Sequence, residues 1–359
     1  MVEEKGYEFV NLAGTSAGAI VATLLAAGYS AVELKEKITE LDFKTLEDPG
    51  TKPRLAARCS ADVRLRSNRR GREWPCQRDP SRYYPAGTQM LIAHLSDVHV
   101  GGQRYRQDLL ETAIAEVNSA GPDLVVVAGD ITDEGYPDQY PIAKTQLAAL
   151  ECQNVVMVPG NHDARNVGYL GFEDTFGARD TTARLTLAGL NVAVVAVDSS
   201  KPDLDTGEIG REHYGWIQEG FAGPADLRVF VCHHHLLPIP GTGRERNQVL
   251  DAGDVLSLLR QAEVDVILAG HRHVPYVWPV GGMLLIHSGT VSTLRTRGFP
   301  HPAYNLIHVK DGRISVTLHV PGGKQQSLGT YPRDWPTELS ARHNDPFVRP
   351  QRGSSLADG

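Results

Sequence analysis

The sequence repeatedly ends a short apolar run with side chains that can bind a metal ion or carry a proton. In VVMVPGNHDAR, residues 155–165, a Pro-Gly pair stops the run and Asn161, His162 and Asp163 follow. A turn needs only one polar residue there, so three adjacent ones indicate a functional site. Four other segments end similarly: LIAHLSDVH in Asp97 and His99, LVVVAGDITD in Asp130 and Asp133, LRVFVCHHH in His233, His234 and His235, and VDVILAGHRH in His271 and His273.

Between residues 90 and 322, these apolar runs alternate with segments of helical pattern. The helices are expected at DLLETAIAEVNSA, YPIAKTQLAAL, residues 211–220 and VLSLLRQAE. The last runs, MLLIHSGT, AYNLIHVKDG and RISVTLHV, follow one another without helices, and the KDGR turn predicts a hairpin between the final two. This order of elements predicts an α/β fold with mixed sheets.

The polar strand ends are expected to meet at one rim, because ligands collect beyond the carboxyl ends of strands in open α/β sheets. Asp97 and His99, like His271 and His273, are two residues apart, so extended backbone directs both members of each pair to one side. Carboxylates, imidazoles and an amide without thiolate suit Mn, Fe, Zn, Co or Ni. The set is too large for one tetrahedral ion and indicates two metals.

DVH, GDITD, GNHD, HHH and GHRH occur in this order, and in this the chain resembles the calcineurin-like metallophosphoesterases. The resemblance implies a four-layer α/β/β/α sandwich of two mixed sheets flanked by helices over residues 90–322. It also implies hydrolysis of phosphoesters by a hydroxide between two metal ions, of which Mn, Fe and Zn are the candidates. The implied ligands are Asp97, His99 and His273 for one metal, Asn161, His233 and His271 for the other, and Asp130 as the bridge.

The remaining roles implied by the resemblance are catalytic. His162 would stabilise the transition state and protonate the leaving oxygen, Asp133 would orient His162, and Asp163 would support the turn. His233 directly follows its strand and is favoured as the ligand over His234, which is expected at the substrate pocket. No role is assigned to His235, and His94 and His287 are expected to be structural because they lie within strands.

Two further segments are similar to the class III cyclic-nucleotide phosphodiesterase branch of that family. They are HHHLLPIP and HSGTVSTLRTRG, although Leu236 and Leu237 stand where that branch commonly has proline. We therefore expect a small phosphodiester substrate, such as a cyclic nucleotide or a glycerophosphodiester. A phosphomonoesterase of the same fold and a metal-free, non-catalytic scaffold are the alternatives.

The N-terminal segment, residues 1–57, has a different pattern of strand, helix and helix. Its GTSAG motif places Ser16 between the strand and the first helix, as in a nucleophile elbow. Residues 4–48 resemble patatin-like phospholipases. The glycine-rich oxyanion loop and the Asp-Gly-Gly/Ala motif of that family have no match, so we expect a truncated fragment without acyl-hydrolase activity. Residues 58–89 are expected to be an Arg-rich linker, and residues 323–359 a flexible tail.

The overall composition narrows the class of partner and the compartment. The net charge of −7 argues against a general nucleic-acid binder. The four cysteines form no C-x-x-C pair and suggest a reducing compartment. The N-terminus is acidic rather than signal-like, and no apolar run reaches the roughly 18 residues of a membrane span. We expect a cytoplasmic enzyme without a transmembrane segment, with a homodimer as the candidate oligomer.

Overall fold

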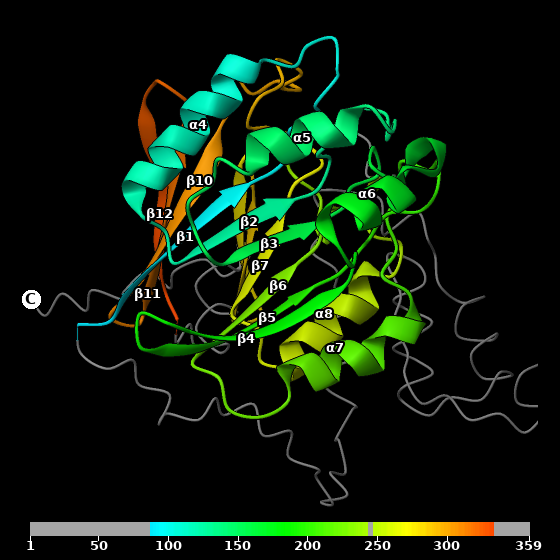
Figure 1. The fold of residues 1–359 in the computed structure, drawn as a ribbon. Coiled ribbons are helices and arrows are strands. Elements are labelled where there is room, and N and C mark those ends of the chain that lie inside the picture. The colour runs from blue at the N-terminus through cyan, green and yellow to red at the C-terminus, as the bar shows by residue number, and fades with distance from the viewer. Residues whose placement is uncertain (1–86, 243–246, 334–359) are drawn as a thin grey trace, which may run out of the picture. The chain divides into compact units, whose positions relative to one another are not determined.

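The computed structural model describes residues 87–242 and 247–333, which belong to one compact unit, Gln77–Gly359. These residues form two six-stranded sheets. Figure 1 shows the sheets stacked face to face, with helices on the outer side of each. The predicted four-layer α/β/β/α sandwich is therefore confirmed. The N-terminal fragment, including Ser16, and most of the predicted linker lie outside the described residues.

The first sheet has the strand order β12-β11-β10-β1-β2-β3. β1, β2 and β3 are parallel, whereas β10, β11 and β12 are antiparallel to their neighbours. The strands are β1 (Gln89–Leu95), β2 (Leu124–Ala128), β3 (Val155–Val158), β10 (Tyr304–Lys310), β11 (Arg313–His319) and β12 (Gln325–Pro332). The predicted hairpin is confirmed: β10 and β11 pair, and Asp311 and Gly312 both adopt positive φ at its turn.

The second sheet has the order β4-β5-β6-β7-β9-β8. Its four inner strands are parallel and its two edge strands are antiparallel. The strands are β4 (Thr181–Leu187), β5 (Leu190–Ala196), β6 (Leu227–Val231), β7 (Val266–Ala269), β8 (Tyr276–Val280) and β9 (Met283–His287). The inner strands are mostly apolar because both of their faces are covered.

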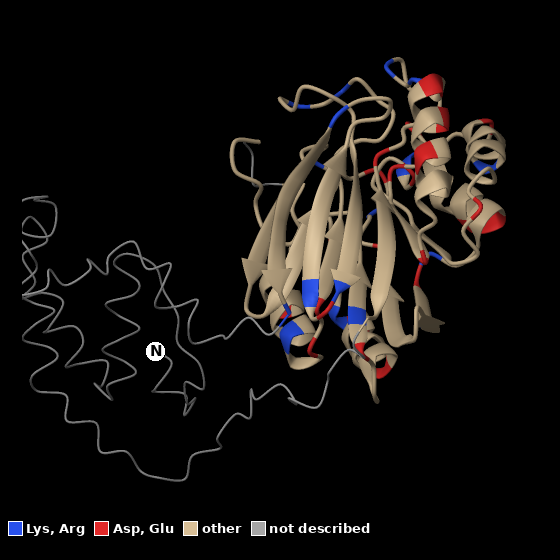
Figure 2. Ribbon diagram, turned by 90° about the vertical axis from the view of Figure 1, so that its left-hand side faces the viewer, with Lys and Arg blue, Asp and Glu red and all other residues tan. Residues whose placement is uncertain are grey.

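Helices cover the outer face of each sheet. α4 (Gln107–Ala120), α5 (Gln139–Leu147) and α6 (Gly168–Phe176) pack on the first sheet, and α7 (Tyr214–Phe221) and α8 (Ala252–Gln261) pack on the second. Short 3₁₀ turns, η3 (Arg165–Val167) and η4 (Arg211–His213), precede α6 and α7. Figure 2 shows charged residues on the helices, loops and strand ends, while the middle of the strands is almost uncharged. The uncharged middle parts of the strands therefore pack into the hydrophobic cores.

The hydrophobic core between the sheets joins alternate residues of both. Ile92 and Val126 from the first sheet share this cluster with Val194 and Val229 from the second. Their chain neighbours, such as Ala93, face the opposite side and pack under α4 and α5. A strand alternates its side chains between two faces, so a strand covered on both faces is apolar at most positions; buried His94 and His287 are exceptions.

The tail prediction is wrong at its start, because the sheet continues beyond residue 322. β12 pairs with β11 along its length although its sequence, QQSLGTYP, is polar. It is an edge strand that gains its stability from backbone hydrogen bonds, so its side chains carry little strand signal. The edge strands β4 and β8 were not predicted either, and Pro279 within β8 is tolerated only because that strand lies at the sheet edge. No helix among the described residues is both long and apolar enough to span a membrane.

We predict that Ile92→Ala lowers the free energy of unfolding by about 2–5 kcal/mol, because Ile92 is fully buried between the sheets. The matched control is Ile142→Ala on α5, where the side chain is 48% exposed, with an expected change within about 0.5 kcal/mol. Urea unfolding followed by circular dichroism measures both. Equal losses in the two variants would contradict the proposed position of the core.

Candidate metal site

The parallel strands of both sheets deliver polar side chains to one rim. Asp97 follows β1, Asp130 follows β2, and Asn161 follows β3 by way of the Pro-Gly pair. His233 and His271 follow β6 and β7 of the second sheet. The rim therefore lies where the carboxyl ends of parallel strands of both sheets meet, as the sequence pattern predicts.

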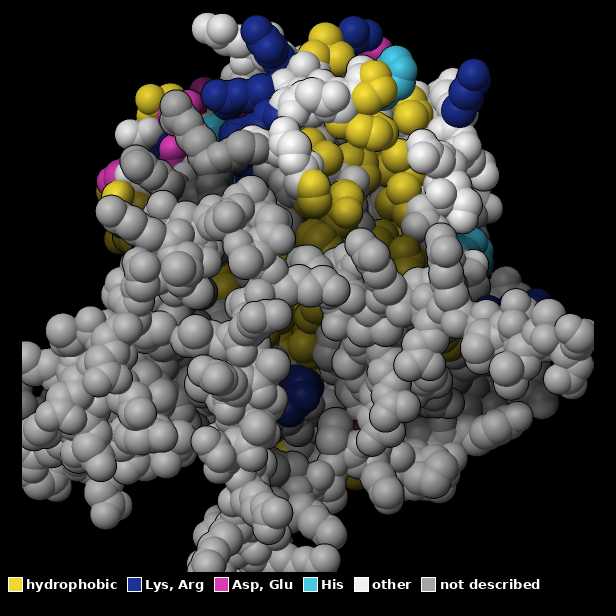
Figure 3. Space-filling model, turned by 180° about the vertical axis from the view of Figure 1, so that it is seen from behind, with side chains coloured by type: hydrophobic (Ala, Val, Ile, Leu, Met, Phe, Trp, Pro, Cys, Tyr) yellow, Lys and Arg dark blue, Asp and Glu magenta, His cyan; other side chains and the backbone are white. Residues whose placement is uncertain are grey.

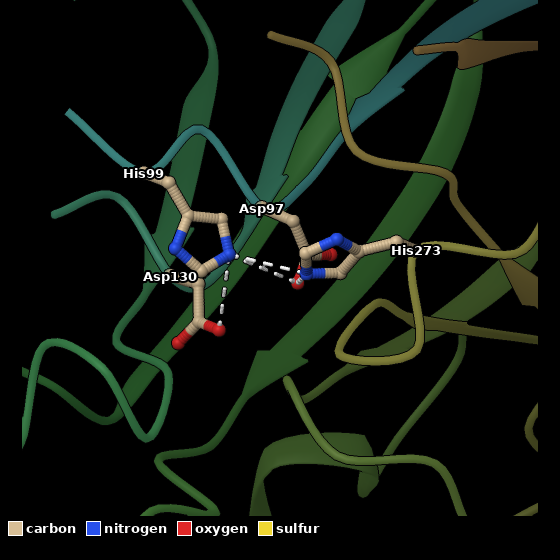
Figure 4. A group of neighbouring side chains, drawn as sticks. All are labelled: Asp97, His99, Asp130 and His273. Carbon is tan, nitrogen blue, oxygen red and sulfur yellow. Dashed lines mark hydrogen bonds and ion pairs between the residues drawn. The ribbon is translucent and has the colours of Figure 1, made fainter. Parts of the chain in front are cut away.

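A first group consists of Asp97, His99, Asp130 and His273, which point toward one another (Figure 4). One potential ligand atom from each lies within 4.8 Å of the others. His273 Nε2 is 3.1 Å from Asp97 Oδ1, and His99 Nε2 is 3.6 Å from Asp130 Oδ2. All four side chains are buried. Two imidazoles and two carboxylates at this spacing form a site that fits one metal ion.

A second group shares Asp130 with the first. It contains Asp130, His233 and His271, again with ligand atoms within 4.8 Å. His233 Nε2 is 3.3 Å from Asp130 Oδ2, and Asn161 Oδ1 is 2.9 Å from His271 Nδ1. The structure thus brings together all seven predicted ligands in two groups with Asp130 in common. This is the arrangement in which a carboxylate can bridge two ions.

The hydrogen bonds of three imidazoles fit metal binding. The Nδ1 of His99 donates to Asp133 Oδ1 at 2.9 Å, and that of His233 donates to the Ala128 carbonyl at 2.7 Å. The Nδ1 of His273 donates to the Arg295 carbonyl. Each ring therefore leaves its Nε2 facing the group, which is the usual orientation of a metal-binding histidine.

Buried donor atoms without hydrogen bonds also fit two metal ions. Among the described residues, Asp97 Oδ1, His233 Nε2 and His271 Nε2 are buried and make no hydrogen bond, although the first two lie 3.1 and 3.3 Å from an ion-pair partner. Leaving a buried polar atom unsatisfied costs about 1–3 kcal/mol. Such atoms gathered at one point are expected where a ligand satisfies them, and their oxygen and nitrogen chemistry suits a divalent ion.

The backbone at the ligands is strained. Asp97, His99, Asp130, His271 and His273 all have positive φ, between 49° and 71°. The left-handed region costs an L-residue other than glycine about 1–2 kcal/mol, although Asp and His adopt it more readily than β-branched residues. Five such residues at one site indicate that the surrounding structure fixes the ligands in place, as at other functional sites.

The electrostatics favour the protonation states that bind metal. Burial opposes ionisation of Asp130, but the facing His233 and His162 hold its pKa well below the usual range. Burial lowers the pKa of His99 to about 4 and that of His271 well below 6.5. The exception is His233: burial lowers its pKa, Asp130 raises it more, and the result is about 9. A metal ion there must displace a proton.

Asp163 holds the turn that presents Asn161 and His162. Its two carboxylate oxygens accept hydrogen bonds from the backbone N–H groups of Ile131, Thr132 and Gly160, at 3.0, 2.8 and 2.9 Å. Burial raises the pKa of Asp163 to about 6. Gly160 packs so closely against Asp130 that a Cβ would overlap its carboxylate. Glycine is therefore required for the close approach of β2 and β3 at the rim.

Asp133 contacts both His99 and His162, through different atoms. Its carboxylate bonds to His99, whereas its backbone carbonyl contacts Nδ1 of His162. The carboxylate Oδ1 is 3.8 Å from that nitrogen. Orientation of His162 by Asp133 is thus expected mainly through the main chain. Arg165 lies on the other side, with Nη1 3.0 Å from Nδ1 of His162.

Asp205 is a site residue that the sequence reasoning missed. It lies in the loop after β5, and its Oδ1 accepts hydrogen bonds from Asn161 Nδ2 at 3.3 Å and from Arg165 Nη2 at 3.0 Å. The first bond fixes the amide so that Asn161 Oδ1 faces His271. No motif marks Asp205, because its role depends on where the loop folds back rather than on a sequence pattern.

His234 does not reach the pocket. It is fully buried, its Nδ1 is 2.9 Å from Ser199 Oγ, and its ring centroid is 4.6 Å from that of His271. The sequence predicts that His234 contacts the substrate. The structure does not support this contact, because the His234 ring packs against the candidate ligand His271 instead. His94 and His287 are fully buried within β1 and β9, in agreement with the structural role expected for them.

An open pocket of about 410 Å³ adjoins the ligands. Asp130, Asn161, His162 and His271 line it, together with one acidic, two neutral and four basic residues. These are Asp205, Thr242, Asn247, Arg165, Arg272, Arg295 and Arg297. A pocket of this volume fits a small molecule, and its arginines favour an anion.

We predict that Asp205→Ala weakens metal binding about 10–100-fold, because outer partners of metal ligands commonly contribute that much. Metal titration with a competing chelator measures the affinity. Asp174→Ala is the control, since Asp174 is exposed on α6, away from the rim, and should leave the affinity unchanged. Unaltered binding in Asp205→Ala would rule out this role.

Comparison with known proteins agrees with this geometry. The family model of calcineurin-like phosphoesterases matches residues 90–275, which contain all seven ligands. A second model, that of patatin-like phospholipases, matches residues 2–134. This match is longer than the expected residues 4–48 and overlaps the phosphoesterase match over residues 90–134. In the structure, the overlapping residues include β1 and β2 of the first sheet and the helix α4.

Related proteins match over most of their length. A probable cyclic nucleotide phosphodiesterase from Rhodococcus erythropolis is 32% identical over 69% of this chain and 89% of its own. A cAMP/cGMP dual specificity phosphodiesterase from Mycobacterium tuberculosis is 26% identical over 74% of this chain and 90% of its own. Their names support a metal-dependent phosphoesterase as the class of enzyme.

Solved structures show the same fold at low sequence identity. A dimetal phosphatase from Danio rerio aligns with a TM-score of 0.50 and 16% identity, covering 67% of this chain and 99% of that one. At this identity the likeness concerns the fold alone. With the family match, the relatives and the ordered metal-binding motifs taken together, the chain belongs to the calcineurin-like phosphoesterase family.

Proposed function

We propose that the protein hydrolyses small phosphodiesters at a centre of two metal ions. The observation that carries this proposal is the pair of ligand groups that share Asp130 beside an open, basic pocket. Asp97, His99 and His273 would hold one ion, and Asn161, His233 and His271 the other. Mn, Fe and Zn are the candidates, because the donors are carboxylate, imidazole and amide.

The reaction follows from what surrounds the pocket. When bound, the two ions would neutralise phosphate charge and make hydroxide accessible near neutral pH. His162 would deliver the proton that the leaving alkoxide needs. Contact of its Nδ1 with the Asp133 carbonyl leaves Nε2 as the nitrogen that donates. Asp163 would fix the positions of the His162 imidazole and the Asn161 amide, because its carboxylate holds the turn that carries both residues.

The substrate class proposed is a cyclic nucleotide or a glycerophosphodiester. The relatives' names support cyclic nucleotides, and the pocket volume is sufficient for a mononucleotide. A phosphomonoesterase remains the alternative within the fold. A panel of phosphodiesters and phosphomonoesters distinguishes the two activities.

We predict that the purified chain hydrolyses bis(p-nitrophenyl) phosphate with Mn²⁺ and loses this activity with EDTA. His162→Ala should lower kcat by about 10²–10⁴-fold, because a general acid contributes that much. Release of p-nitrophenolate measures the rate. Metal content should stay the same in the variant, since His162 is assigned no ligand role.

The matched control is His308→Ala on β10, where the half-buried side chain lies away from the rim. Its kcat should equal that of the unaltered chain. Turnover of p-nitrophenyl phosphate alone would favour the monoesterase. Absence of turnover on both substrates with every metal would leave the non-catalytic scaffold.

A serine acyl hydrolase is the alternative of another class, through Ser16 in the patatin-like segment. We predict that Ser16→Ala leaves metal-dependent diester hydrolysis unchanged, because Ser16 is none of the seven proposed ligands and precedes the first of them, Asp97, by about 80 residues in the sequence. Hydrolysis of p-nitrophenyl butyrate should be at background with and without EDTA. Chelator-resistant butyrate cleavage that disappears in Ser16→Ala would instead establish a second activity.

The oligomeric state and the compartment stay predictions. Figure 3 shows hydrophobic side chains gathered on the face seen from behind, a surface type that supports association of two copies. Sedimentation equilibrium distinguishes a monomer from the predicted homodimer. The dispersed cysteines, of which Cys232 is buried and Cys152 partly buried as free thiols, support the predicted cytoplasmic location.

A further inference from the structure

Arg165 lines the pocket beside His162, and the proposed reaction gives it no role. It begins the 3₁₀ turn η3, three residues after His162, and its backbone N–H donates to the His162 carbonyl at 3.3 Å. Its side chain is 25% exposed, so most of it lies among neighbouring side chains. Those neighbours determine what the guanidinium can do.

Carboxylates from the loops of both sheets hold the guanidinium. Arg165 Nη1 is 3.2 Å from Oε1 of Glu134, in the segment after β2, and Nη2 is 3.0 Å from Oδ1 of Asp205, in the loop after β5. The planar fork of an arginine can bind both carboxylates at once. Because these carboxylates are 40% and 60% exposed, the ion pairs contribute little to the stability of the fold. Their main consequence is the position of the guanidinium.

The backbone beside Arg165 is tied to the same two segments. The N–H of Asn166 donates to Asp203 Oδ1 at 2.9 Å, and its side-chain amide donates to the Glu134 carbonyl at 2.9 Å. Gly135, with φ 67°, comes so close that a Cβ there would overlap the Arg165 carbonyl. The main chain of Arg165 is therefore fixed independently of its side-chain ion pairs.

The guanidinium and a backbone carbonyl meet the same nitrogen of His162. Arg165 Nη1 is 3.0 Å from Nδ1, and the Asp133 carbonyl contacts Nδ1 as well. A guanidinium can only donate a hydrogen bond, whereas a carbonyl can only accept one. Nδ1 therefore has a partner whether or not it carries a proton, and Nε2 is the nitrogen left for the pocket in both cases.

We propose that Arg165 is a positioning residue for His162. Held by Glu134 and Asp205, it keeps Nε2 of the imidazole directed at the leaving oxygen. As the hydroxide forms its bond to phosphorus and the bond to the leaving oxygen breaks, the Nε2 proton passes to that oxygen. The ring is then neutral and retains its proton on Nδ1, facing the Asp133 carbonyl. This inference rests on the proposed phosphodiesterase function and adds a residue to it.

Two substrates that differ only in the leaving group test the proposal. They are the p-nitrophenyl and phenyl esters of thymidine 5′-phosphate, and only the more basic phenolate depends strongly on a proton donor. At saturating Mn²⁺, Arg165→Met should lower kcat about 10²-fold on the phenyl ester, as misplacing a reacting group by about 1 Å can do. The loss on the p-nitrophenyl ester should be below about tenfold. Equal losses on both esters indicate a merely structural role and would overturn the inference.

Two further variants serve as controls. Arg179 also pairs with two carboxylates, those of Glu173 and Asp198, each at 2.8 Å, but it does not line the pocket. Arg179→Met should therefore leave the ratio of the two rates unchanged. In a His162→Ala background, Arg165→Met should lower neither rate further, because its effect passes through His162. A further loss in that background, or an equal change of the ratio in Arg179→Met, would contradict the positioning role.

A measurement without catalysis separates failure of this inference from failure of the proposed function. In the chain labelled with ¹⁵N-histidine and without added metal, the His162 ring signals are identified by their loss in His162→Ala. They should shift in Arg165→Met and stay in place in Arg179→Met. If neither ester is hydrolysed but the signals shift, the positioning role holds and the proposed function fails. Unchanged signals in Arg165→Met overturn the positioning role.

Discussion

The position of the Asp130 carboxylate is the constraint on which the site depends. Its Oδ2 faces His233 at 3.3 Å and His99 at 3.6 Å, so one side chain connects the ligands of both sheets. Asp130 can do this because β2 ends at the rim, and its carbonyl accepts a hydrogen bond from the His99 N–H at 2.9 Å. A Cβ on Gly160 would displace its carboxylate, and His162 N–H donates to its Oδ1 at 2.8 Å. The positions of His99, His162 and His233 are therefore tied to the Asp130 carboxylate.

The fold stabilises an arrangement that is costly on its own. Five ligands have positive φ, and several buried imidazole and carboxylate atoms lack hydrogen bonds. The large apolar clusters between and outside the sheets offset this cost, since burial contributes about 25 cal/mol for each Å² of apolar surface. Rigid strands therefore hold loops whose own conformation is unfavourable, and this is the usual way in which preorganised sites are maintained.

Sequence reasoning found the parts of the site that depend on apolar runs followed by polar residues. The extended backbone expected at the Asp97–His99 and His271–His273 pairs is wrong, because all four residues have positive φ. Asp97, Asp130 and Asn161 stand directly beyond apolar runs, so their convergence follows from parallel strand order alone. Asp205 and Arg297 could not be found in this way, because they lie in irregular loops whose path is set by packing far from them in sequence. His234 shows the opposite case: its position next to His233 suggested the pocket, but its bond to Ser199 turns the ring into the interior.

The sequence by itself indicated an α/β fold, through apolar runs of strand length that alternate with helical segments. Its five ordered motifs gave the family resemblance, and that resemblance implied the four-layer sandwich and the candidate metal-binding side chains. The tertiary structure decided that β12 belongs to the first sheet, that Asp205 accepts a hydrogen bond from Asn161, and that four arginines line one pocket. Each of these depends on contacts between segments distant in the chain, and the local pattern of such segments carries no information about their partners.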